Sequence, residues 1–221
     1  LVEQVWVGDS HSVTMNSPRM VTALSRRPGG LWICHLGPRI MYSVATNGLP
    51  PALLRTMRMI GSSRRAQDIV WGFSFGEIDV RCHLAPRMAD PEVALAFVPA
   101  YLQRIHEAAT LAGARRALLL VPPPQSDGFH EEFGFPIVGT IEERVAANLA
   151  LRDALVSAAA ELPADGAELH LVDLTDDLSD ERGAINEALT YDGLHANDAG
   201  REVFRRRVGE VLDSAANGAP A

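Results

Sequence analysis

Five short, nearly continuous apolar runs alternate with helix-like segments along the whole chain. The runs are residues 5–7, 31–34, 69–73, 117–121 and 169–172. Strands of this kind are typical of parallel sheets, which are buried on both faces by the helices that connect them. The alternation therefore predicts a doubly wound α/β fold, a three-layer α/β/α sandwich around a five-stranded parallel sheet.

Helix signals fill the segments between the runs. Asp90 followed by Pro91 favours a helix start, and apolar side chains at helical spacing, from Val93 to Ile105, predict one helix that ends at Gly113.

Two later segments carry similar signals. Thr140 and Glu143 have the spacing of a capping box, in which each residue bonds the other's backbone. Asn197 or Asp198 can cap a last helix. We expect one domain over residues 1–213, followed by a small, polar and flexible tail over residues 214–221.

The composition excludes several classes of protein. The net charge of -8 argues against a nucleic-acid partner. No run of 18 or more apolar residues is present, so we expect no membrane span. The two cysteines, Cys34 and Cys82, do not form a disulfide framework, and the chain opens directly into a strand-like run. We therefore expect cytoplasmic residence.

Three polar or glycine-containing turns follow predicted strands. Ser10, Gly37 and Gly76 each come just after an apolar run. In a parallel sheet these positions meet at the carboxyl edge, where ligands bind. Ser10 sits on a strand-to-helix turn that exposes its hydroxyl, so it is a candidate nucleophile; the alternative is that it only caps the first helix.

A candidate base lies near the other end of the chain. His195 stands just before the last predicted helix, and Asp192 can reach its ring through a tight turn at Gly193. In this arrangement His195 takes the proton of Ser10 while Asp192 fixes the imidazole tautomer. The alternative is a surface histidine beside a capping aspartate.

These two segments resemble the SGNH or GDSL family of serine esterases and acyltransferases. The first block is Gly8-Asp9-Ser10, and the last is Asp192-Gly193-Leu194-His195 followed by Asn197 and Gly200. The resemblance implies a flavodoxin-like SGNH hydrolase fold, the catalytic residues Ser10, His195 and Asp192, and an oxyanion hole built from the N–H groups of Ser10 and Gly37.

The third block departs from the family pattern. Where the family has Gly-x-Asn-Asp, this chain has Gly76-Glu77-Ile78-Asp79, and Ile78 offers no side-chain donor. Loss of one oxyanion donor typically costs about 2.7–4 kcal/mol of transition-state stabilisation. Arg81 is a candidate replacement.

Other polar residues near these blocks are candidate substrate ligands. Glu77, Asp79 and Arg81 would share one face of an extended segment and could grip substrate; the alternative is an ion pair in which Arg81 bridges the two acids. Asp9 is interpreted as a turn-holding residue. His11 could touch substrate, but a structural role in the first helical turn is favoured.

The segment 122–139 is long for a connection and carries three phenylalanines. Phe129, Phe133 and Phe135 could form an apolar wall for an acyl chain, or could simply fix the loop to the body.

Possible metal ligands lack the spacing of known metal sites, so we expect neither a metal nor another cofactor. The residues considered for that role are Asp9, His11, Glu77, Asp79 and His83.

The sequence therefore predicts serine-dependent acyl transfer from an ester or acyl-CoA donor to a carbohydrate hydroxyl. The Gly-Asp-Ser-His variant resembles domains that acylate sugars. The composition, lysine-free and rich in alanine and arginine, suits a high-GC actinobacterium, and in that setting the chain resembles the mycobacterial octanoyltransferases of methylglucose lipopolysaccharide synthesis. The alternatives are a carboxylester hydrolase, such as a carbohydrate deacetylase, and a non-catalytic sugar-binding module.

Overall fold

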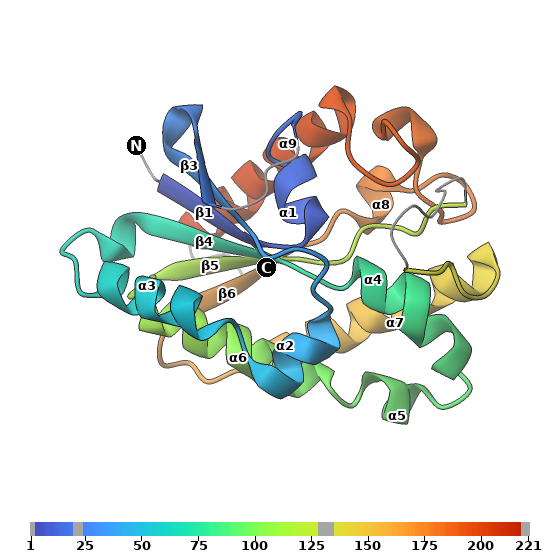
Figure 1. The fold of residues 1–221 in the computed structure, drawn as a ribbon, viewed down its shortest axis with the longest axis horizontal. Coiled ribbons are helices and arrows are strands. Elements are labelled where there is room, and N and C mark those ends of the chain that lie inside the picture. Colours follow the sequence, from blue (N-terminus) through green and yellow to red (C-terminus); the bar gives the residue numbers. More distant parts are fainter. Residues whose placement is uncertain (1–2, 20–23, 128–134, 218–221) are drawn as a thin grey trace.

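A six-stranded sheet forms the centre of the molecule in the computed structural model, which describes residues 3–19, 24–127 and 135–217 (Figure 1). The strand order is β2-β3-β1-β4-β5-β6. All neighbouring strands run parallel except β2 and β3, which are antiparallel. The bounds are β1 Glu3–Gly8, β2 Leu24–Arg27, β3 Leu31–His35, β4 Ile69–Ser74, β5 Arg116–Leu120 and β6 Glu168–Val172.

The prediction of a three-layer α/β/α fold is confirmed, but the prediction of five strands is wrong. All five apolar runs form parallel strands. The additional strand β2 is a short antiparallel edge strand that includes Arg26 and Arg27, and none of its residues is fully buried. Charged edge strands of this kind lack the apolar pattern that indicates a central strand.

Helices cover both faces of the sheet (Figure 1). One layer contains α1 (Ser10–Thr14), α8 (Thr175–Leu178) and α9 (Asp198–Ala216). The other contains α2 (Met41–Asn47), α3 (Pro51–Gly61), α6 (Val98–Leu111) and α7 (Ile141–Ala159). Between β4 and α6 lie the short helices α4 (Glu77–Asp79) and α5 (Pro91–Leu95), with the π-helical turn η3 (Val80–Leu84) and the 3₁₀ turn η4 (Ala85–Arg87) between them.

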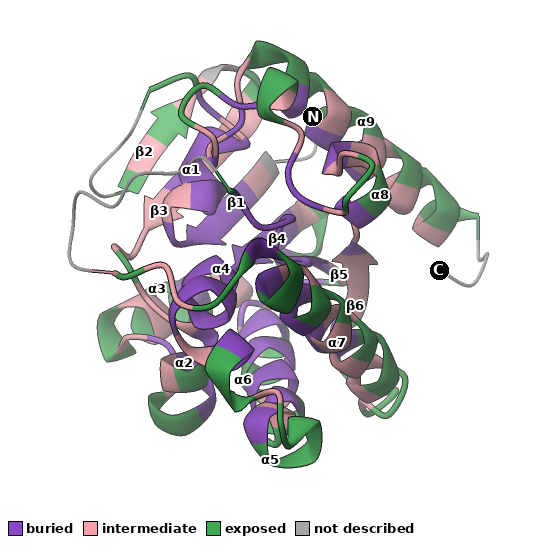
Figure 2. Cartoon of the chain, turned by 90° about the vertical axis from the view of Figure 1, so that its right-hand side faces the viewer, coloured by how far each residue is buried: buried purple, intermediate pink, exposed green. Residues whose placement is uncertain are grey.

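Each face of the sheet has its own apolar core, because successive strand side chains point to opposite faces. In β1, Trp6 packs into the core beneath α9, whereas Val5 and Val7 pack into the core on the other side. Figure 2 shows that the buried residues are concentrated on the sheet and on the inner sides of the helices.

The predicted helix between Asp90 and Gly113 is two helices. Asp90 caps the first, α5, as expected, but the chain leaves the helix before α6 begins at Val98. Pro99 lies in the first turn of α6, where its missing N–H is tolerated; one continuous helix would need that N–H. As a result Val93, predicted to line a buried face, is 73% exposed.

The other helix caps are confirmed. Thr140 and Glu143 form both bonds of the capping box of α7, and Asn197 caps α9. Helix α9 continues to Ala216, so residues 214–216 of the predicted tail are helical. Residues 218–221 lie outside the described part.

No helix among the described residues is long and apolar enough to cross a membrane.

The sheet order places the start of α1 at a topological switch point. After β1 the chain forms β2 and β3 on one side of β1, and then β4, β5 and β6 on the other side. Ligands of doubly wound folds bind in the crevice at such a point, beyond the carboxyl ends of the strands. Ser10 follows the carboxyl end of β1.

Candidate active site

The turn from β1 into α1 is held by backbone contacts that leave no room for a side chain at Gly8. A Cβ atom at Gly8 would lie 2.0 Å from the carbonyl oxygen of Ser74, at the end of β4. The Asp9 N–H donates to that same oxygen at 3.1 Å. The Asp9 carboxylate accepts from the His11 N–H and caps α1, so Asp9 is the turn-holding residue and Ser10 is the first helical residue rather than the cap.

The segment before α9 forms a tight loop that presents His195. The Tyr191 N–H donates to the His195 carbonyl, and Gly193 at the tip has φ +86°, as the predicted turn requires. The Asp192 Oδ1 atom accepts from the backbone N–H groups of Leu194 and His195. The Asp192 side chain is therefore fixed by its own loop.

The structure brings the three predicted catalytic residues into one hydrogen-bonded chain. The Nδ1 atom of His195 lies 2.6 Å from Asp192 Oδ2, and its Nε2 atom lies 2.9 Å from Ser10 Oγ. Burial raises the pKa of Asp192, but the bonds from the His195 ring and backbone outweigh it, so the pKa lies below its ordinary value. An ionised Asp192 places the ring proton on Nδ1 and leaves the Nε2 lone pair facing the Ser10 hydroxyl.

Two aromatic rings flank the His195 imidazole. Tyr191 stacks on it with ring centroids 5.8 Å apart, and His11 packs 5.3 Å away at an angle of 34°. His11 is buried, and its Nδ1 lies 3.7 Å from Asp9 Oδ1. Burial lowers the pKa of His11, but the Asp9 carboxylate and the charge of Glu77 raise it above the ordinary value. His11 is therefore a buried residue of the first turn of α1 that packs against the His195 ring.

The candidate oxyanion donors lie at adjoining strand ends. The Leu36 N–H donates to the Gly8 carbonyl at 2.8 Å, which holds the segment after β3 against the start of the Ser10 turn. Gly37 follows directly. Among the hydrogen bonds of the described residues, none uses the Gly37 backbone N–H, so this donor is available to a ligand.

The segment after Gly76 is helical, which corrects the prediction of an extended face. In α4 and η3, Glu77 and Arg81 are four residues apart and form a buried ion pair with an N–O distance of 2.7 Å. The third nitrogen of the guanidinium donates to the Phe135 carbonyl. The ion-pair interpretation therefore holds for Arg81 and Glu77, and the guanidinium donates to the Glu77 carboxylate and to the Phe135 carbonyl.

The Asp79 side chain instead caps the N-terminus of α2, a helix that is distant from it in the sequence. Its two carboxylate oxygens accept from the backbone N–H groups of Met41, at 2.6 Å, and Tyr42, at 3.0 Å. Burial raises the pKa of Asp79 to about 7, and the charge of Asp9 adds to the effect. No local pattern indicates this role, because the bonded groups lie 38 and 37 residues apart in the chain.

Two buried arginines hold the long connection after β5. Arg144 donates to the carbonyl groups of Ser126 and Gly139, while Arg81 accepts, through its own carbonyl, a bond from Val138.

Phe129 and Phe133, the predicted acyl wall, lie outside the described residues. Within the described part of the chain, no three His, Cys, Asp or Glu side chains come together as metal ligands.

Comparisons of sequence find no relative: no family model matches the chain, and no curated protein matches it. Comparisons of structure find solved structures with a similar fold. A candidate SGNH hydrolase from Slackia heliotrinireducens is 13% identical with a TM-score of 0.57, over 96% of this chain and 98% of that one. The chain has the SGNH-hydrolase fold.

Other structures share this SGNH fold. A carbohydrate esterase of family 3 from Talaromyces cellulolyticus is 14% identical with a TM-score of 0.54, and the match covers 100% of both chains. The OSK domain of Drosophila Oskar is 10% identical with a TM-score of 0.54, over 94% of this chain and 87% of that one. At these identities the likeness establishes the SGNH fold, and the chemistry must be argued from the residues.

Proposed function

We propose that this protein catalyses serine-dependent acyl transfer through an acyl-enzyme, with Ser10 as nucleophile, His195 as base and Asp192 as the residue that orients His195. The observation that carries the proposal is the unbroken chain of contacts from Asp192 Oδ2 through the His195 ring to Ser10 Oγ. A hydroxyl is a weak nucleophile unless a base takes its proton, and a base held by a third group supplies that activation.

In the first step Ser10 Oγ forms a bond to the acyl carbonyl carbon, while its proton moves to His195 Nε2. The negative charge on the carbonyl oxygen is stabilised by the N–H groups of Ser10 and Gly37. The bond to the leaving oxygen or sulfur then breaks, and the leaving group takes the proton from His195. Water or an alcohol repeats these steps in reverse order and frees Ser10.

The acyl acceptor decides between hydrolysis and transfer. We propose a carbohydrate hydroxyl as acceptor and an ester or acyl-CoA as donor, with octanoyl transfer as one form of this reaction. The Gly8-Asp9-Ser10-His11 sequence supports it, because it resembles sugar-acylating domains. The likeness in fold to a carbohydrate esterase equally suits transfer of the acyl group to water, that is, carboxylester hydrolysis or carbohydrate deacetylation.

An aryl ester assay separates a serine acyl-transfer enzyme of either kind from a non-catalytic sugar-binding module. We expect the protein to release p-nitrophenol from acyl esters, and the Ser10→Ala variant to lose that release by at least about 10³-fold, as in other triad enzymes. Ser157→Ala, on the exposed side of α7, is the matched control and should keep the wild-type rate. A non-catalytic sugar-binding module would release nothing and would bind sugars equally well as Ser10→Ala.

Addition of sugar acceptors then tests transfer. If an acylated sugar forms at the expense of free acid, the acceptor is a carbohydrate; if only free acid forms with every sugar, the protein is a hydrolase.

A further inference from the structure

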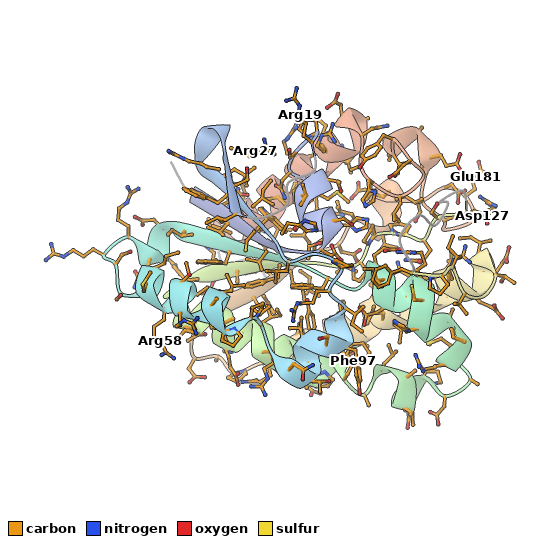
Figure 3. All side chains as sticks on the ribbon, viewed as in Figure 1. Arg19, Arg27, Arg58, Phe97, Asp127 and Glu181 are labelled. Atoms are coloured by element: carbon orange, nitrogen blue, oxygen red, sulfur yellow. The ribbon has the colours of Figure 1, made fainter. Side chains whose placement is uncertain are left out.

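A groove of about 650 Å³ opens between α2, the turns η3 and η4, and α5. This volume falls within the range of about 300–1,000 Å³ that is typical of small-molecule sites. Its walls are mainly apolar side chains. The apolar side chains of the walls include Ile40, Leu84, Val93, Ala94 and Phe97, of which Phe97 is labelled in Figure 3.

The groove is lined by residues that follow the carboxyl ends of β3 and β4. Ile40, on its wall, is three residues after the oxyanion candidate Gly37, a separation that an extended chain spans in at most about 11 Å. Asp79, also on its wall, is three residues after Gly76, just beyond the end of β4. Both strands flank β1 in the sheet, so the segments that line the groove leave the same carboxyl edge at which Ser10 lies.

Three charged side chains of the groove are hydrogen-bonded to the protein backbone. The Asp79 carboxylate accepts from two backbone N–H groups of α2, and Asp90 accepts from the Val93 N–H. Arg87 donates to the His83 carbonyl. Burial and the nearby Arg87 lower the pKa of His83, which favours its neutral form. A ligand in this groove meets mainly apolar surface.

We propose that this groove binds the alkyl chain of a fatty acyl group whose carbonyl carbon reacts with Ser10. The inference rests on the proposed function and names its substrate class: acyl chains well beyond acetyl. An acetyl group would leave the apolar walls in water, whereas each further methylene buried against them contributes about 0.8 kcal/mol.

The rim residue Val93 provides a test that does not disturb the core, since it is 73% exposed. Val93→Trp places a ring in the groove, and it should lower the ratio of kcat/KM for p-nitrophenyl decanoate over that for p-nitrophenyl acetate by tenfold or more. Val156→Trp is the matched control; Val156 is 50% exposed on α7 and does not line the groove, so its ratio should equal that of the wild type.

A binding measurement keeps the test independent of turnover. In the Ser10→Ala variant, decanoate should bind measurably more tightly than acetate by calorimetry, and Val93→Trp should weaken decanoate binding by tenfold or more. If Ser10 reacts with esters but Val93→Trp leaves the ratio and the binding unchanged, the groove proposal is overturned while the proposed function stands. If decanoate binds as inferred but Ser10 never reacts, the proposed function fails and the groove is an alkyl-chain site only. If Val93→Trp changes only the oligomeric state, the groove is a contact between copies and the proposal is overturned.

Discussion

The Nε2 atom of His195 lies 2.9 Å from the Oγ atom of Ser10, although the two residues are 185 positions apart in the chain. The parallel sheet creates this proximity. It places the end of β1, which precedes Ser10, at the same edge as the loop that leads into α9. The predictions below follow from this contact and from the buried groups around it.

Asp192→Asn should reduce kcat by about 10³–10⁴-fold with little change in fold, because an amide no longer selects the tautomer that leaves Nε2 free to accept. Steady-state kinetics on an aryl ester measure the effect, and circular dichroism checks the fold. A loss of less than tenfold would contradict the role assigned to Asp192. The exposed Asp153→Asn on α7 is the matched control and should keep the wild-type kcat.

His11→Phe should move the acidic limb of the kcat/KM profile upward by about one pH unit. The variant keeps a ring against His195 but removes the titratable group whose protonated form Asp9 and Glu77 stabilise, so the charge that this group carries beside the His195 ring at low pH is lost. The pH dependence of kcat/KM is the measurement. His106→Phe, a buried histidine of α6, should leave the profile unchanged; an unchanged midpoint in His11→Phe would show that His11 only fills space.

Asp79 should make the protein less stable as the pH rises from 5 to 8. Its pKa is raised by burial to about 7, above the value of about 3.9 in the unfolded chain, so the folded state holds a proton that the unfolded state has lost. The contribution of Asp79 to the free energy of unfolding is complete below about pH 4 and is lost as the pH rises through the folded pKa. Between about pH 5 and pH 8 the free energy of unfolding should decrease on the order of 2 kcal/mol.

Urea unfolding of the wild type and of Asp79→Asn at several pH values measures this effect. The asparagine variant should show a flatter dependence because it does not titrate. A wild type and variant with parallel pH dependence would assign the titration to other groups.

Gly8→Ala and Gly209→Ala should change stability in opposite directions. A methyl group at Gly8 meets the Ser74 backbone oxygen, so the overpacking should cost about 3 kcal/mol. Gly209 lies inside α9 with nothing within 4 Å of the added atom, and alanine there should stabilise the protein by about 0.5–1 kcal/mol. Thermal unfolding of the two variants measures both signs. A neutral Gly8→Ala would contradict the tight turn before Ser10.

The two ends of the site could be predicted from the sequence because their signals are local. A buried strand followed by Ser10, and the Asp192–His195 spacing around Gly193, each specify their own turn. The parallel sheet, itself visible in the apolar runs, then brings the two turns together.

The segment from Glu77 to Arg81 could not be predicted in the same way. Its residues suit one face of a strand at a spacing of two and one face of a helix at a spacing of four. Distant contacts fit the helix, since Asp79 caps α2 and the Arg81 carbonyl accepts from Val138. The edge strand β2 has no apolar pattern that indicates a strand, because two of its four residues are the arginines Arg26 and Arg27.

Mass spectrometry of the protein after brief incubation with a p-nitrophenyl ester at low pH tests the central claim most directly. The account predicts an increase in mass equal to one acyl group, located by digestion on the peptide that contains Ser10 and absent from Ser10→Ala. An acyl group on any other residue, or no acyl-enzyme although the ester is turned over, would contradict the account.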